Sequence, residues 1–351
     1  MHFRRLRDIV AVCLAFACIS CFAQTTSPLT PPWPQTPPPF PLPQAAPSDP
    51  EPTLSHNATW GEQYHGLAFT VQLIRDTYRI GEHGEHIDAA TWLTNFGTKP
   101  VEFSVTGPDS DHRYALFYAD GHPVPPSKFA REVEEHLRTD PIIITRNFPV
   151  TLKPGEIQRG DSINDIQRWF DITESGTYTL IVMRSVPGFW NGFIVSNPIT
   201  LQITGGKAPS TTGTAPAWGN PTNGLVLSLT VGEPVAGAIN CHLRLKNVGD
   251  DVKTIFSTTF PRFFHLALFD AAGNAVPKTQ RTLDAEDETL PRDEQGGIDK
   301  LAPDKTLDDD FNLRDFFQIT KGGTYRLMVM RREDSWFKGF AVSNMVTFTV
   351  H

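Results

Sequence analysis

Residues 176–184 read GTYTLIVMR, and residues 323–331 read GTYRLMVMR. Each stretch leads into a Gly-Phe-x-Val-Ser-Asn sequence, at Gly192–Asn197 and at Gly339–Asn344. The second half of this 351-residue chain therefore repeats the first. A repeat of about 130 residues is long enough to bury one hydrophobic core of its own.

Further blocks match in the same order along the chain. The matched pairs are Trp60-Gly61 with Trp218-Gly219, Leu93-x-Asn95-x-Gly97 with Leu245-x-Asn247-x-Gly249, and Ala115-Leu116-Phe117 with Ala267-Leu268-Phe269. The offset between copies shrinks along the chain, so the length differences fall between the matched blocks. Loops tolerate such differences, which predicts that the matched blocks are the scaffold.

Within the blocks, apolar and polar residues alternate with a period of two. Residues 67–73 and 225–230 show this pattern, and turn residues such as Asp120-Gly121 and Asn191-Gly192 separate the runs. The pattern predicts short strands that each bury one face. Residues 126–138 have helical spacing and are expected to form a short helix. We predict an all-β fold of two tandem immunoglobulin-like antiparallel β-sandwiches, over residues 57–205 and 218–351, joined by a linker over 206–217.

The first residues have the pattern of a secretory signal peptide. Three arginines precede an apolar run from Ile9 to Phe22, and Ala23 offers a small residue for cleavage. We therefore predict a signal peptide over residues 1–23, export to the periplasm or the cell exterior, and no membrane span after cleavage. Residues 24–56 are rich in proline and are expected to form a disordered linker. Cleavage would leave Cys241 as the one cysteine, so no internal disulfide is expected.

The formal charge of the chain is -8. It falls to about -10 without the signal peptide, because three arginines and Asp8 leave with it. An acidic chain without a basic stripe has no electrostatic reason to bind nucleic acid, so we predict no nucleic-acid partner.

Residues 171–178, DITESGTY, resemble the segment before strand F of immunoglobulin-like domains, and residues 318–325 keep its glycine and tyrosine. The resemblance implies structural roles for Gly176, Tyr178, Gly323 and Tyr325, with each tyrosine hydroxyl bonded to backbone upstream. The paired cysteines of antibody domains are missing, so the copies look like the bridge-free modules of bacterial exported proteins. The order of motifs is also similar to sandwich domains beside secreted proteases and to proteinase inhibitors of the BsuPI type.

No nucleophile elbow, phosphate loop, dinucleotide-binding turn or His-Glu-x-x-His zinc motif occurs in the sequence. His83 and His86 could ligate a metal or line a polar loop. The acidic runs at Asp109–His112 and Asp308–Asp310 could hold calcium or be solvated turn residues. Two carboxylate pairs, Asp165 with Asp171 and Glu134 with Glu135, have no spacing that indicates catalysis. We predict a protein that is not an enzyme and has no cofactor or metal.

The repeated aromatic residues are the best candidates for binding. Phe189 and Trp190 in the first copy, and Trp336 and Phe337 in the second, fall where a hairpin is expected to turn. Adjacent residues point to opposite faces, so each pair directs one ring outward, where it could stack on a sugar or anchor a protein contact. The same rings could instead cap the core or pack between the copies. We predict a binding or scaffold protein with a protein or glycan partner in the cell envelope; the alternatives are a secreted proteinase inhibitor and a carbohydrate-binding module.

Overall fold

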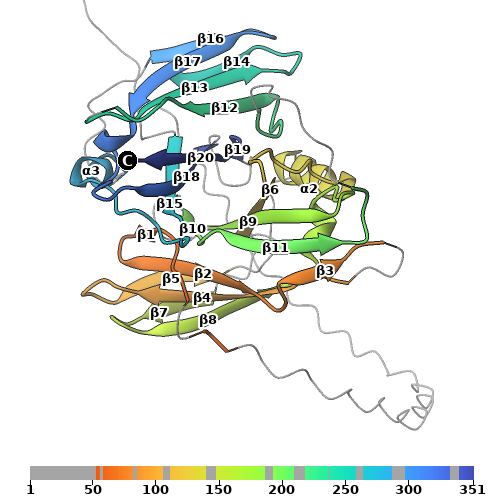
Figure 1. Cartoon of the computed structure of the whole chain (residues 1–351), viewed down its shortest axis with the longest axis vertical. Coiled ribbons are helices and arrows are strands. Elements are labelled where there is room, and N and C mark those ends of the chain that lie inside the picture. The colour runs from red at the N-terminus through yellow and green to blue at the C-terminus, as the bar shows by residue number, and fades with distance from the viewer. Residues whose placement is uncertain are drawn as a thin grey trace, which may run out of the picture. The chain divides into compact units, whose positions relative to one another are not determined.

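The computed structural model of the chain (Figure 1) places the residues that form the two copies. It describes residues 53–55, 58–81, 85–105, 111–139, 148–185, 193–208, 218–235, 237–257, 264–286, 297–332 and 340–351. The predicted signal peptide and most of the proline-rich linker lie outside these ranges. From Pro52 to His351 the chain forms one compact unit.

The first copy contains two main sheets. One has the strand order β1 (Gln63–Tyr64), β2 (Leu67–Leu73), β4 (Ala89–Asn95), β8 (Ile157–Ile163). The other is built on β9 (Gly176–Ser185), which pairs with β6 (His112–Tyr118), β10 (Phe193–Val195) and β11 (Ile199–Thr204), and β11 also pairs with β3 (Thr77–Arg79). A short pair of β5 (Val101–Val105) and β7 (Phe148–Leu152) completes the copy. These pairings are antiparallel except for β3 with β11.

The second copy repeats this arrangement. Its first sheet has the order β12 (Leu225–Val231), β13 (Asn240–Asn247), β17 (Thr306–Asn312). In its second sheet, β18 (Gly323–Arg332) pairs with β15 (Phe264–Asp270), β19 (Phe340–Val342) and β20 (Val346–Val350). β14 (Lys253–Ser257) pairs with β16 (Gly297–Leu301).

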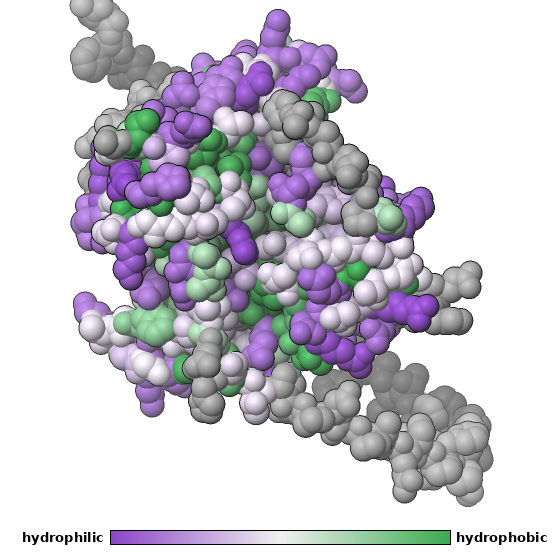
Figure 2. Space-filling view, viewed as in Figure 1, coloured by the Kyte–Doolittle hydropathy of each residue, from purple (hydrophilic) through white to green (hydrophobic). Residues whose placement is uncertain are grey.

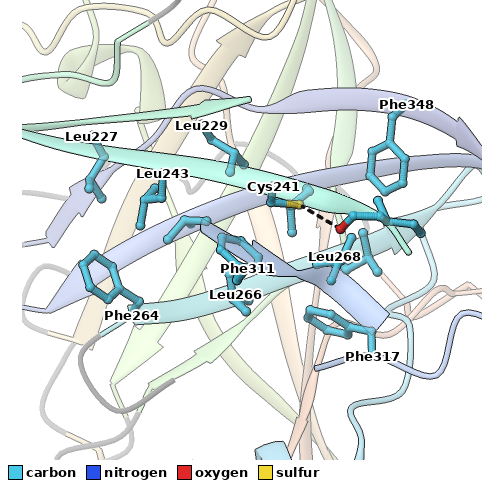
Figure 3. Packing of buried hydrophobic residues seen from close by; sticks show 14 of the residues in the cluster. Leu227, Leu229, Cys241, Leu243, Phe264, Leu266, Leu268, Phe311, Phe317 and Phe348 are labelled. Atoms are coloured by element: carbon cyan, nitrogen blue, oxygen red, sulfur yellow. Dashed lines mark hydrogen bonds between the residues drawn. The ribbon is translucent and has the colours of Figure 1, made fainter. Parts of the chain in front are cut away.

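Each copy encloses its own hydrophobic core. The first core includes Phe69, Leu93, Leu116 and Leu180, which come from strands of both sheets. Figure 3 shows the second core, in which Leu227 and Leu243 of one sheet face Phe264 and Leu266 of the other. Alternation explains these cores, since one face of each strand is buried against the opposite sheet. The chain is an all-β protein of two immunoglobulin-like sandwiches, as predicted.

The repeated Leu-x-Asn-x-Gly motif ties the end of a strand to its neighbours. The side-chain amide of Asn95 donates to the carbonyls of Lys99 and Leu152, and its oxygen accepts from the Gly97 N–H. Asn247 makes the equivalent three bonds in the second copy. Both asparagines are fully buried, so this motif serves the scaffold.

The repeated Val-Ser-Asn sequence has a similar role. The Ser196 hydroxyl accepts a hydrogen bond from the Val182 N–H, and Ser343 accepts one from the Val329 N–H. Asn344 then bonds both backbone groups of Leu229 across the sandwich. These bonds join the two sheets of a copy where the last strand is interrupted.

The predicted helix is α2 (Lys128–Thr139), and the second copy has a shorter helix, α3 (Gln280–Glu286). Single 3-10 turns are found at η1 (Ile166–Trp169) and η2 (Leu313–Asp315). In the part of the chain that the structure describes, no helix is long and apolar enough to cross a membrane.

The two sandwiches pack against each other through their second sheets, so four sheet layers follow one another in Figure 1. The contact is a third hydrophobic cluster, which we call the seam. Its buried residues come from β6, β9 and β10 of one copy and from β15, β18, β19 and the position just before β20 of the other. They are Ala115, Phe117, Ile181, Met183, Phe193 and Val195 with Ala267, Phe269, Met328, Met330, Phe340 and Met345. Nearly every one of these residues has its counterpart from the other copy in the same cluster, so the seam is close to two-fold symmetric.

Candidate binding site between the two sandwiches

The four aromatic residues predicted to bind a partner lie outside the described residues. Phe189, Trp190, Trp336 and Phe337 belong to the segments 186–192 and 333–339. The aromatic residue that follows in each copy is described. Phe193 and Phe340 point into the seam, where their rings meet edge to face with centroids 4.5 Å apart.

The glycines and tyrosines given a structural role lie at the start of β9 and β18. The Tyr178 hydroxyl donates to the Glu174 carbonyl over 2.8 Å, and the Tyr325 hydroxyl donates to the Lys321 carbonyl over the same distance. Gly176 and Gly323 have φ angles of 156° and 145°, which residues other than glycine rarely adopt. Burial raises the pKa of Tyr178, and the nearby Tyr118 and Glu174 act in the same direction, so its hydroxyl stays a donor at neutral pH.

The candidate metal ligands are described only in part. His83 and Asp109 lie outside the described residues, and His86 contacts Asp165 at 3.3 Å. Among the residues that are described, no group of three metal-binding side chains is found. Asp308 and Asp310 are not in a turn but on β17, where they face the basic side chains of β13.

The seam ends in two equivalent sites that differ in their residues. One contains Glu62 from the segment before β1, together with His265 of β15 and Lys278 of the second copy. The other contains the counterparts of these residues in the repeat, which are Asn220, Arg113 and Pro126 in the same order. We call the first the closed site and the second the open pocket.

The closed site is filled by charged side chains. The Glu62 carboxylate bonds to His265 Nε2 and lies 3.6 Å from Lys278 Nζ, and Glu62 and Lys278 are 4% and 8% exposed. Burial by itself would raise the pKa of Glu62, but the charges and hydrogen bonds of His265 and Lys278 lower it overall. Glu62 is therefore ionised at neutral pH, and its charge is compensated inside the seam.

Close backbone contact holds Glu62 in this place. Its N–H donates to the Val195 carbonyl over 3.0 Å. A Cβ on the preceding Gly61 would lie 2.0 Å from the same carbonyl oxygen, so only glycine allows the segment to run so near β10. The repeated Trp-Gly pair thus places the next side chain over the seam.

The open pocket has a volume of about 130 Å³. Pro126, Ala130, Val133 and Trp169 line it from the first copy, and Phe340 and Val342 line it from the second. Its polar lining includes Arg113, Glu134, Asn220 and Thr222. The pocket remains because Pro126 stands where the closed site has the long side chain of Lys278, and Asn220 stands where it has Glu62.

Local sequence explains why α2 forms one wall of this pocket. Ser127 caps the helix: its hydroxyl accepts from the Ala130 N–H over 3.1 Å and donates to the Arg168 carbonyl. These bonds tie the start of α2 to η1 and place Ala130 and Val133 beside Trp169. Phe129 packs edge to face on Trp169 and stays 37% exposed, which adds an apolar surface on the same helix.

The pocket suits an apolar group. A cavity of roughly 150 Å³ holds one benzene ring, so the open pocket has room for a single ring or a large aliphatic side chain. The lining is mainly apolar, and its two charged residues, Arg113 and Glu134, have opposite signs. The sequence patterns missed this site because its walls come from segments that lie far apart in the chain. A comparison of Glu62 and Lys278 with Asn220 and Pro126 in the repeat was the available signal.

No family model and no curated protein matches the sequence. Among solved structures, the chain is similar to the Escherichia coli chaperone DraB, with 11% identity over 81% of this chain and 98% of that chain and a TM-score of 0.17. It is also similar to a structure of the CsuC-CsuE chaperone-tip adhesion subunit pre-assembly complex of Acinetobacter baumannii, with 13% identity over 80% of this chain and 97% of that chain and a TM-score of 0.18. The YadV chaperone gives 12% identity over 80% and 99%, with a TM-score of 0.17. At such TM-scores these likenesses are no guide to what this chain binds.

Proposed function

We propose that this chain is an exported, non-enzymatic binding protein, and that it anchors an apolar side chain of a partner protein in the open pocket. The observation that carries the proposal is the pocket itself, which lies where the equivalent closed site is filled by Glu62, His265 and Lys278. Export rests on the predicted signal peptide and places the partner in the cell envelope.

The chemistry of the pocket favours a protein side chain as the ligand. Protein interfaces gain much of their affinity from single aromatic or aliphatic anchors that enter small, desolvated pockets. Phe129, which is 37% exposed and packs on the lining residue Trp169, supplies contact area near such an anchor. The aromatic residues Phe189, Trp190, Trp336 and Phe337 stay proposed as a second contact.

Site-specific photo-crosslinking tests this function. A photoreactive phenylalanine analogue at Val133, inside the pocket, is expected to capture a discrete envelope protein in the producing cells. The same analogue at Leu283 of α3, which is 39% exposed and away from the pocket lining, is the control position. Capture at both positions alike, or at neither, would refute the pocket as the binding site.

Affinity for the captured protein then separates pocket filling from a general effect on α2. Ala130→Leu fills the pocket and is expected to weaken binding at least tenfold. Glu132→Leu adds the same side chain at an exposed position of the same helix and is expected to leave binding unchanged. Combining Trp190→Ala with Trp336→Ala measures the contribution of the aromatic residues; equal binding by wild type and Ala130→Leu would contradict the proposal.

A further inference from the structure

The closed site holds the charged contact that crosses the seam. The Glu62 carboxylate pairs with His265 and with Lys278, so both ion pairs join the two copies. The hydrophobic cluster around which the seam is built is apolar by contrast. Apolar contact has little directional preference, whereas a buried carboxylate requires its partners at defined positions.

The near symmetry of the seam creates a choice of partners. Because the two faces carry equivalent apolar residues, the first sandwich of one molecule could also pack on the first sandwich of another. That pairing would place Glu62 against Arg113 and Pro126. Pairing of two second sandwiches would place His265 and Lys278 against Asn220, which would bury a lysine without its carboxylate. A buried charge without a partner is strongly unfavourable.

We propose that Glu62 is the lock of the seam: it fastens the first sandwich to the second in the same chain by neutralising Lys278 and His265. The backbone N–H of Glu62 donates to the Val195 carbonyl, and this bond holds the carboxylate in place. The lock therefore belongs to the first copy, and the cations that it neutralises belong to the second. The inference holds whatever ligand the open pocket binds.

Thiol labelling tests the lock in the full-length chain. Ala267 is fully buried in the seam, so a cysteine introduced there by Ala267→Cys reacts when the seam opens. Native Cys241 is buried in the second core, where burial raises its pKa to about 12, so it reacts when that core unfolds. Mass spectrometry of the labelled peptides reads the two positions separately in one sample.

In this background, Glu62→Gln is expected to raise the labelling rate at position 267 at least tenfold while Cys241 remains protected. Adding Lys278→Met to Glu62→Gln removes the stranded ammonium group and is expected to return the rate to near that of the parent. Asp304→Asn, which breaks the exposed pair of Lys246 and Asp304 at 3.0 Å, is the control and is expected to change neither rate.

The rescue distinguishes a charge lock from simple packing. If the double variant labels as fast as Glu62→Gln, the carboxylate acts through packing and the proposal is wrong. It is equally wrong if Glu62→Gln leaves position 267 protected, or if both cysteines react together because the whole sandwich has unfolded. Partner capture at Val133 is measured on the chain without these substitutions. Failure of the crosslinking experiment would therefore leave the thiol-labelling result unaffected.

Discussion

Single hydrogen bonds from buried side chains fasten the loops of both sandwiches. Tyr178 and Tyr325 illustrate this, because each hydroxyl reaches a carbonyl four residues upstream across the end of the sandwich. Asn95 and Asn247 do the same at another corner. The identical residues recur because each copy must satisfy the same backbone groups, and an unmade bond there costs more than a made bond gains.

Removing either tyrosine hydroxyl should therefore destabilise the protein without disrupting its core. Tyr178→Phe and Tyr325→Phe are each expected to lower the free energy of unfolding by about 1 kcal/mol, because a half-buried carbonyl loses its donor. Chemical denaturation measures the change. Thr349→Val is the control, since this exposed hydroxyl has only a 3.5 Å contact with Thr324 and its removal should have little effect. Wild-type stability in both tyrosine variants would rule out this role.

Strand β17 shows how one element divides its two faces between solvent and core. Asp308 and Asp310 face outward and pair with Arg244 and His242 of β13 across distances of 2.9 and 2.7 Å. Phe311 belongs to the core on the other side. The surface above β13 and β17, at the top of the view, is accordingly hydrophilic (Figure 2). Acidic residues on this strand thus balance the basic residues of its neighbour.

Substitutions on the two faces of β17 should differ in size. Asp308→Asn is expected to cost less than about 1 kcal/mol, and about 0.5 M salt should remove the difference from wild type, because exposed ion pairs are weak and screened. Phe311→Ala is expected to cost about 3 to 5 kcal/mol and to be insensitive to salt, since it leaves a cavity. Unfolding by urea at two salt concentrations measures both. A larger loss for Asp308→Asn, or a rise in stability on adding calcium, would favour a metal site instead.

The seam makes the two sandwiches one unit at the scale of the whole molecule. Backbone contact contributes beside the apolar cluster: the Met345 N–H donates to the Gly121 carbonyl over 2.9 Å. A Cβ on Gly121 would lie 1.9 Å from the Met345 carbonyl oxygen, whereas a Cβ on its counterpart Gly273 would lie 3.6 Å from Pro198. Close approach is thus required on one side of the seam and not on the other.

These two glycines offer a matched test of the seam. Both have positive φ, 87° and 85°, so alanine strains the turn by a similar amount of about 1 kcal/mol at either position. Gly121→Ala adds a clash with the second sandwich and is expected to split one thermal transition into two. Gly273→Ala is expected to shift the transition without splitting it. Differential scanning calorimetry resolves the outcomes. Identical traces for the two variants would contradict the role of the Gly121 contact in joining the two sandwiches.

Much of the scaffold could be predicted from the order of residues because its causes are local. Alternation along residues 67–73 and 225–230 indicated strands, and the repeated motifs placed Tyr178 and Tyr325 at the start of a strand. A two-residue period and a turn residue act over a few positions, so they can be recognised without knowing what packs against them. Because the second half of the chain repeats the first, the prediction of one sandwich became a prediction of two.

The candidate site depended on tertiary structure. Glu62 and His265 are separated by 203 positions, and no periodicity relates them. The acidic run at Asp308 to Asp310 was predicted in a turn, but it lies in strand β17, where Asp308 and Asp310 pair with basic side chains of β13. The sequence by itself determined two sandwiches, since strand patterns are local; only the folded chain decided that their second sheets face each other, because that contact joins apolar faces that look like ordinary core. From that contact follow one closed site and one open pocket.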